Sequence, residues 1–265
     1  MKKSIFVFNF LPFGHSANPA LDTGLFRRDN SSIITYQEAI RPNQSDLAKA
    51  LEYYNRGIAK RSLGRYSEAI PYYNKAIELN PKMTKGYFNL GISYEYLDDL
   101  ENAILYFRKT TDLDQGFIQA YFHWGVVTYK LGNPSGAIEL YNITIQLDPK
   151  MSLAYFNRGI AKEKLKEYKG AVEDYTRTHE LDPLNALAYF SSGMVRNVLG
   201  DHRGAIFEFD KAIEINPKNH WAYHHRGISK SKVGDITEAC MDWTRAGELG
   251  SKISYEMIKS HCNSS

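Results

Sequence analysis

Long apolar runs and an excess of one charge are both missing from this chain of 265 residues. No stretch approaches the roughly 20 apolar residues that a helix needs to cross a bilayer, so no membrane span is predicted. The 33 basic and 30 acidic residues are spread along the chain without the basic stripe that is typical of nucleic-acid-binding proteins. We therefore do not expect nucleic acid as a partner.

Sequence motifs of enzymes are absent as well. The chain has no glycine-rich phosphate loop, no zinc-protease histidine pair and no serine nucleophile elbow. His220 and His224 have the spacing of two metal ligands on one helix, but no third ligand falls at a matching position. Solvent-exposed groove histidines are the favoured interpretation. We predict no enzyme activity, no cofactor and no metal site.

The N-terminal segment has some features of a secretory signal. Met1–Lys3 carry positive charge and precede an apolar run over residues 4–13, which is the order found in export signals. Asn9 and Pro12 interrupt this run, so an uncleaved tail is the alternative. The pattern slightly favours a periplasmic or secreted location over a cytoplasmic one.

The chain does have a repeat of 34 residues. Steps of 34 from Gly57 meet a glycine each time, and the same steps from Tyr53, Ala69 and Tyr73 meet a tyrosine, an alanine and an aromatic residue. We call each set of equivalent positions a column. The glycine column is Gly57, Gly91, Gly125, Gly159, Gly193 and Gly227, and the aromatic column is Tyr73, Phe107, Tyr141, Tyr175, Phe209 and Trp243. Six matches in each of four columns indicate six tandem repeats.

Each repeat is predicted to be a pair of helices. The tyrosine and glycine columns are four residues apart, as are the alanine and aromatic columns, so each pair of columns lies on one helical face. A leucine such as Leu97 is expected to continue the first face. Pairs such as Leu63-Gly64 end the first helix and pairs such as Asn80-Pro81 end the second. Small residues opposite large aromatic ones allow the two helices to approach closely.

This pattern resembles the tetratricopeptide repeat family over residues 50–253. The resemblance implies an all-α solenoid, a right-handed superhelix of six helix–turn–helix repeats with a concave groove lined by the first helices. The last repeat, around residues 234–262, also resembles that of Bacteroidetes-type bacterial tetratricopeptide proteins. The predicted repeats are 50–83, 84–117, 118–151, 152–185, 186–219 and 220–253, with a capping helix and tail at 254–265 and a possible signal segment and linker or irregular N-terminal cap at 1–49.

Three columns of the first helices would face the groove if the family's helix orientation holds here. A polar column lies two residues before each glycine, an aromatic column lies three residues before it, and an apolar column lies one residue after it. We predict that these columns bind an extended peptide. The alternative is that the aromatic residues close the core while the asparagines are merely solvated. The predicted groove residues are Asn55, Asn89, His123, Asn157, Phe88, Phe122, Phe156 and Phe190.

One known specificity of the family is predicted to be absent. Family members that clamp the C-terminal carboxylate of heat-shock chaperones use a lysine–asparagine–arginine set, and only Asn89 agrees with it here. The matching positions are Tyr54, Ile58, Asn89, Gln119 and His123.

Cysteine is scarce, with only Cys240 and Cys262 in the chain. Cys240 stands in a column that is mostly isoleucine, so we expect it to be buried against the following helix, which carries Cys262. A disulfide that staples the cap is one possibility in an oxidising compartment. Two buried free thiols that act as small apolar side chains are the other.

These observations predict a non-enzymatic scaffold or adaptor that holds an extended segment of a protein partner in its groove. The alternative is a recognition subunit of an enzyme or of a cell-envelope assembly or transport complex. Residues 1–49 are too few for a separate catalytic domain, which favours the first interpretation.

Overall fold

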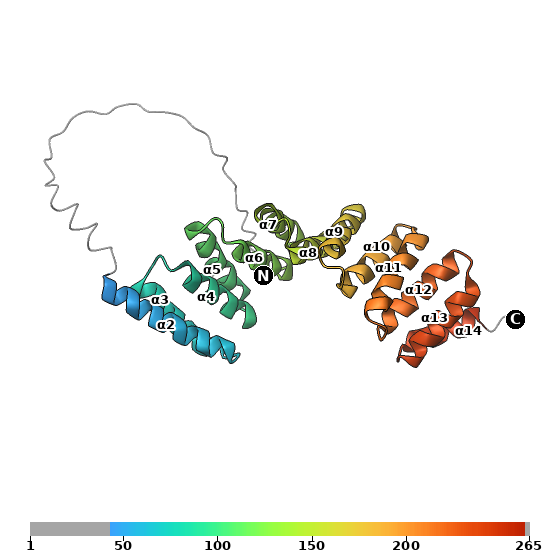
Figure 1. The fold of residues 1–265 in the computed structure, drawn as a ribbon, viewed down its shortest axis with the longest axis horizontal. Coiled ribbons are helices and arrows are strands. Elements are labelled where there is room, and N and C mark those ends of the chain that lie inside the picture. Colours follow the sequence, from blue (N-terminus) through green and yellow to red (C-terminus); the bar gives the residue numbers. More distant parts are fainter. Residues whose placement is uncertain (1–42, 263–265) are drawn as a thin grey trace, which may run out of the picture. The chain divides into compact units, whose positions relative to one another are not determined.

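A computed structural model describes residues 43–262, and every regular element in this range is a helix (Figure 1). The predicted export signal lies outside the described residues. The helices are α2 Gln44–Ser62, α3 Tyr66–Leu79, α4 Thr84–Tyr96, α5 Leu100–Leu113, α6 Ile118–Lys130, α7 Pro134–Leu147, α8 Ser152–Lys164, α9 Tyr168–Leu181, α10 Ala186–Val198, α11 His202–Ile215, α12 His220–Lys232, α13 Ile236–Glu248 and α14 Lys252–His261.

Packing runs almost entirely between neighbours in the chain. Each helix contacts the one before it and the one after it, from α2 through α14, and the first helices α4, α6 and α8 also touch in turn, as do α10 and α12. Repeats that contact only their neighbours define a solenoid. The predicted all-α helical-repeat fold is confirmed.

Two boundaries differ from the sequence-based ones. Helix α2 begins at Gln44, six residues before the predicted first repeat, because the Asn43 side chain accepts a hydrogen bond from the Asp46 N–H at 2.8 Å and caps the helix there. Helix α14 begins at Lys252 and therefore takes the last two residues of the predicted sixth repeat.

The glycine column is explained by a close approach of the two helices within each repeat. A Cβ atom built on Gly91 would lie 2.5 Å from the Phe107 ring, and one on Gly227 would lie 2.6 Å from the Trp243 ring. Both rings are fully buried. Each second helix thus lays its large aromatic side chain on the bare backbone of the first helix, as the small–large pattern predicted.

The leucine column does not continue the buried face, contrary to the sequence-based expectation. Leu97 is 45% exposed and Leu131 is 50% exposed. Each is the C-cap residue, where the helix has ended, so a helical projection no longer gives its direction. The next residue takes a positive φ, 59° at Asp98 and 81° at Gly132, which turns the chain toward the second helix.

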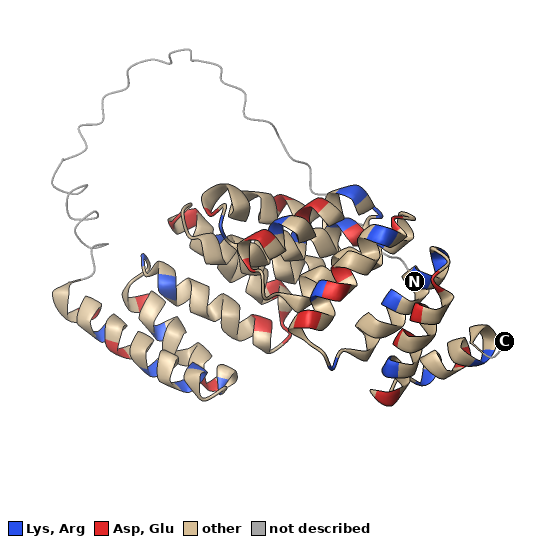
Figure 2. Ribbon diagram, turned by 45° about the vertical axis from the view of Figure 1, so that its right-hand side comes forward, with Lys and Arg blue, Asp and Glu red and all other residues tan. Residues whose placement is uncertain are grey.

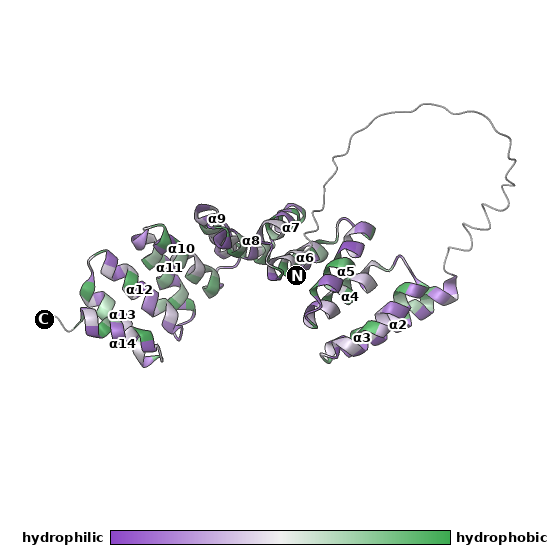
Figure 3. Ribbon diagram, turned by 180° about the vertical axis from the view of Figure 1, so that it is seen from behind, coloured by the Kyte–Doolittle hydropathy of each residue, from purple (hydrophilic) through white to green (hydrophobic). Residues whose placement is uncertain are grey.

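Charges and apolar residues are mixed along the array. Basic and acidic residues are interspersed along the helices in Figure 2, which agrees with the even charge distribution in the sequence. Figure 3 shows short apolar and polar segments following each other within each helix. Among the described residues, no helix is both long enough and apolar enough to cross a membrane.

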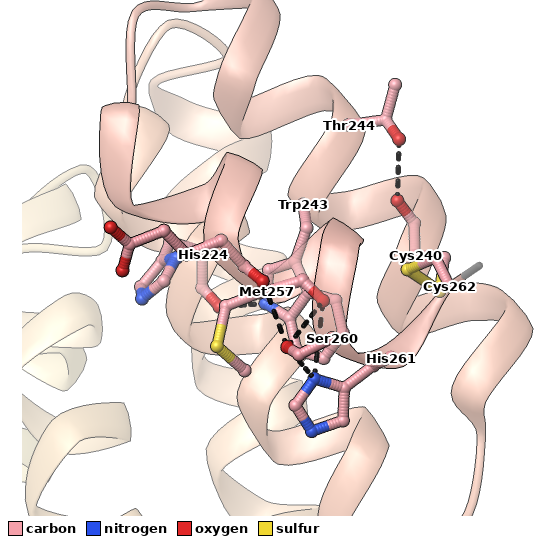
Figure 4. The surroundings of a disulfide bond; sticks show 9 residues. His224, Cys240, Trp243, Thr244, Met257, Ser260, His261 and Cys262 are labelled. Atoms are coloured by element: carbon pink, nitrogen blue, oxygen red, sulfur yellow. Dashed lines mark hydrogen bonds between the residues drawn. A yellow bond between two sulfur atoms is a disulfide. The ribbon is translucent and has the colours of Figure 1, made fainter. Parts of the chain in front are cut away.

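Helix α14 covers the end of the last repeat. His224 Nδ1 lies 2.8 Å from Ser254 Oγ, and the Trp243 indole N–H donates to the His224 carbonyl oxygen at 3.1 Å. A disulfide joins Cys240 to Cys262, so α13 and α14 are also linked covalently (Figure 4). Cys240 is half-buried rather than fully buried, because it lies at the edge of the contact between these helices.

Candidate functional site

One face of each first helix stays accessible in the last three repeats. In α8 this face consists of Leu153, Asn157, Ile160 and Lys164, which follow each other at helical spacing. The two end residues are exposed and the two middle ones are half-buried, whereas Ala154 on the other side is fully buried. We call this the open face. Its equivalents are Leu187, Ser191, Met194 and Val198 in α10, and Trp221, His225, Ile228 and Lys232 in α12.

The predicted polar column is not a continuous ladder of solvated groups. Asn89 is only 4% exposed, because its amide nitrogen donates to Tyr54 Oη at 3.0 Å and to the Lys85 carbonyl at 2.8 Å. This corrects the expectation that it is solvated. Asn55 is exposed, and Asn157 is half-buried with its amide nitrogen donating to the Leu153 carbonyl at 2.8 Å.

His123 connects two first helices. Its Nδ1 lies 2.9 Å from Glu95 Oε2, and its ring lies against the rings of Phe88 and Phe107, each at 5.8 Å between centroids. Glu95 is also 3.5 Å from Lys130 Nζ. The imidazole therefore already contacts Glu95 and two phenylalanine rings of the protein itself. Of the four predicted polar residues, Asn55 and Asn157 keep accessible amides, and they are three repeats apart.

The predicted aromatic column packs within its own repeats. Each member is half-buried and lies against the second-helix aromatic residue of the same repeat, which is the alternative that the sequence left open. Ring centroids are 5.9 Å apart for Phe88–Phe107, 6.0 Å for Phe122–Tyr141, 5.7 Å for Phe156–Tyr175 and 5.8 Å for Phe190–Phe209. A direct role of these rings in binding stays a prediction.

A different column carries large exposed apolar side chains on the open face. Leu153 is 50% exposed, Leu187 57% and Trp221 47%, and they occupy the same helix position in three consecutive repeats. We call these three residues the apolar stripe. The sequence contains the signal, since the column lies six residues before each glycine. Lys85 and Gln119 interrupt that column in the second and third repeats, and this hid it.

The opposite end of the open face is basic in two of the three repeats. Lys164 and Lys232 are exposed, and no described acidic group lies within ion-pair distance of either. They follow Leu153 and Trp221 by eleven residues, or about 16 Å along the helix. By contrast, Lys162 and Lys230 on a neighbouring face pair with buried aspartates at 2.9 and 3.0 Å. We call Lys164 and Lys232 the basic rim.

The histidines at the end of the stripe carry no charge near neutral pH. Burial, together with a smaller effect of the neighbouring His224, lowers the pKa of His225 to about 4. Burial also lowers the pKa of His224, which is 4% exposed and not a solvated groove histidine as expected from the sequence. Trp221 stacks on the neutral His225 ring at 6.2 Å. No three metal-ligating side chains come together within residues 43–262.

Comparisons with known proteins identify the repeats. Sequence models described as tetratricopeptide repeat match residues 44–83, 84–117, 124–183, 186–219 and 208–241. A comparison with curated proteins found no match. None of the matches supports the predicted relation of the last repeat to Bacteroidetes-type proteins.

Solved structures with the same fold include three informative ones. The crystal structure of MamA protein is 26% identical, with a TM-score of 0.60, over 69% of this chain and 96% of that one. YrrB, described as a TPR protein with an unusual peptide-binding site, is 21% identical, with a TM-score of 0.64, over 71% and 97%. PilF from Pseudomonas aeruginosa is 16% identical, with a TM-score of 0.67, over 82% and 99%.

Proposed function

The chain belongs to the tetratricopeptide repeat family, and on this premise we propose that it is an adaptor whose open face binds an extended, apolar segment of a partner protein. Proteins with this fold generally serve as protein-interaction scaffolds, without catalysis of their own. A recognition subunit of a larger enzyme or envelope complex would use the same surface in the same way.

The apolar stripe is the observation that carries this proposal. A single exposed leucine needs no explanation, but large apolar side chains that recur at one helix position in three consecutive repeats indicate a shared binding surface. Leu153, Leu187 and Trp221 each leave about half of their surface accessible. Tryptophan is the residue most enriched at binding hot spots, which makes Trp221 the expected anchor.

The spacing of the repeats suggests the conformation of the bound segment. Packed helices lie about 8–10 Å apart, and three residues of polyproline II conformation advance about 9 Å. A segment with an apolar side chain at every third residue can therefore place successive side chains on Leu187 and Trp221, whose helices α10 and α12 touch. A segment that already favours this conformation loses little conformational entropy when it binds.

The basic rim suggests the charge of the partner. Lys164 and Lys232 place two positive charges, which have no acidic partner among residues 43–262, on the far side of the open face. Acidic residues in or beside the bound segment would be attracted to them, which raises the association rate more than the final affinity. We therefore propose a segment that is apolar at every third residue and acidic in between.

A synthetic peptide tests this proposal directly. A fluorescent peptide with leucine at every third position and aspartate between should bind the full chain, and a shuffled peptide of the same composition should bind much more weakly. Trp221→Ala should weaken binding by about 2 kcal/mol, or roughly 30-fold. Fluorescence anisotropy measures both effects.

The matched control is Leu51→Ala. Leu51 occupies the same helix position in the first repeat and is 54% exposed, but it lies outside the stripe. Its loss should leave peptide affinity unchanged. Equal affinity for the shuffled peptide, or an equal loss in the Leu51 and Trp221 variants, would refute the proposed surface.

A further inference from the structure

Buried carboxylates lie at three successive junctions between repeats in the second half of the array. They belong to Asp174, Glu208 and Asp242, which are equivalent positions 34 residues apart. Each is at most 4% exposed. A carboxylate that is removed from water in this way stays ionised only if cations and hydrogen-bond donors surround it. The three junctions differ in the cation that they provide.

Arginine secures the first of these junctions. Arg158 of α8 donates from Nε to Asp174 Oδ2 of α9 at 2.9 Å and from Nη1 to Asn142 Oδ1 of α7 at 2.7 Å. Its guanidinium lies 5.4 Å from the centre of the Tyr155 ring, and Lys162 adds a second cation 2.9 Å from the carboxylate. Three helices from two repeats therefore meet at one permanently charged group.

The last junction repeats this arrangement. Arg226 donates from Nε to Asp242 Oδ2 at 2.9 Å and from Nη1 to Asp210 Oδ1 at 2.6 Å, and it lies 5.4 Å from the Tyr223 ring. Lys230 is 3.0 Å from the same carboxylate. Both outer junctions thus rest on an arginine, which stays charged at every pH that proteins tolerate.

The middle junction has no such arginine, because its position is occupied by Ser192. His179 of α9 takes the place of the guanidinium instead. Its ring stacks on Tyr189 with centroids 4.3 Å apart, as the arginines lie over the equivalent tyrosines, and its Nε2 is 3.6 Å from Glu208 Oε2. Arg196, in the lysine column, donates to the other carboxylate oxygen at 3.1 Å.

Hydrogen bonding at the middle junction is incomplete. Ser192 Oγ, His179 Nε2 and Glu208 Oε2 are all buried, and none of them has a hydrogen-bond partner among the described residues. The equivalent aspartate oxygens of the outer junctions are all bonded. The middle junction therefore has fewer hydrogen bonds to stabilise it, and the side chain that stands in place of the arginine is one that titrates in the physiological range.

We propose that the junction between the fourth and fifth repeats is an acid-labile joint of the array, in which His179 replaces the permanently charged arginine that secures the two flanking junctions. The groups that face His179 are Glu208 on α11, Arg196 and Tyr189 on α10, and Glu180 on its own helix. Arg196 already neutralises the charge of Glu208. Protonated His179 would therefore gain little attraction from this carboxylate, while its burial would remove the water that hydrates its charge.

The direction of the pH effect follows from this balance. Burial lowers the pKa of His179, and the opposing attraction of Glu208 does not compensate. The neutral ring is thus the form that the folded junction prefers. Because the unfolded pKa is about 6.5, the stability contributed by the neutral ring is complete above that pH and is lost as the pH falls below it.

Hydrogen exchange resolved by helix, at pH 7 and pH 5, tests the joint in the intact chain. After correction for the intrinsic exchange rate, acid should increase exchange in α9–α11 but not in α6–α8, whose junction rests on Arg158. Resolution by helix is needed because the buried His224 and His225 act on α12–α14 in the same pH range. His179→Gln, which cannot be protonated, should remove the increase in α9–α11.

A second variant can restore an outer-type junction at the middle position. Ser192→Arg with His179→Ile restores the arginine column and places at residue 179 the isoleucine found at its equivalents, Ile145 and Ile213. This variant should also lose the acid-induced exchange. An increase that persists in His179→Gln, or wild-type protection in α9–α11 that is constant or greater at pH 5, would overturn the proposal.

Discussion

Adding one methyl group to Gly125 should destabilise the protein, whereas the same change at Gly170 should not. A Cβ on Gly125 would lie 2.7 Å from Cε1 and 3.0 Å from Cδ1 of Tyr141, whose ring is 1% exposed and cannot move aside. Overpacking of this kind costs about 1–3 kcal/mol, and the higher helix propensity of alanine offsets up to about 1 kcal/mol of it. We expect a net loss of about 1–2 kcal/mol for Gly125→Ala.

Gly170 provides the matched control because it is also a helical glycine. Its added Cβ would meet only the Lys162 side chain, with Cδ at 3.2 Å, which a shift of a few tenths of an ångström relieves without breaking the ion pair to Asp174. Gly170→Ala should therefore be neutral or stabilising by about 0.5–1 kcal/mol. Thermal melts followed by circular dichroism should separate the two variants, with Gly125→Ala lower by roughly 2–8 °C. Equal melting temperatures would refute the glycine–aromatic packing that defines the repeat.

Three further predictions concern the polar column, the cap and the terminal histidines. Asn89→Ala should lower the free energy of unfolding by about 0.5–1.5 kcal/mol in a denaturant titration, because it removes the hydrogen bond to Tyr54. Asn157→Ala should change it by no more than about 0.5 kcal/mol. The reverse order would contradict the assigned burial. Cys262→Ser should destabilise α14 by about 3 kcal/mol, because it opens the loop of 22 residues that the disulfide closes. Amide exchange in α2 and α3 should not change. Free thiols in the oxidised wild type would contradict this prediction. Because the pKa of His225 is lowered, the stability that its neutral ring contributes to α12–α14 is fully present above pH 6.5 and is lost as the pH falls toward 4. His225→Gln should reduce this acid-induced loss of protection in hydrogen-exchange measurements. An unchanged loss would exclude His225 as its source.

The fold could be predicted from the sequence because each repeated residue type has one packing role. Gly91 and Phe107 already show in the sequence that a helix backbone must pass close to a large ring. The prediction that the leucine column is buried was wrong because a helical projection assumes that the helix continues, and at Leu97 the helix has already ended. Six matches to a column therefore establish a repeat but not the direction of every side chain.

The candidate site was harder to predict because members of one column have different neighbours. Asn89 is buried because the preceding repeat offers the Tyr54 hydroxyl, whereas Asn157 follows Phe122, which has none. This difference is visible in the sequence once the neighbouring column is compared. The role of His179 is not, because it belongs to another column and another helix and reaches Glu208 only because α9 and α11 both pack against α10.

The most direct test of the proposed function is a hydrogen-exchange footprint of the full chain with the patterned leucine–aspartate peptide bound. The account predicts new protection along α8, α10 and α12, which carry the apolar stripe, and no change in α9, α11 and α13. Phe207 on α11 is 57% exposed, as much as Leu187. A peptide that binds nonspecifically to exposed apolar side chains would therefore protect the second helices as well. Protection on α11 equal to that on α10, or no protection on α8, α10 and α12, would contradict the account.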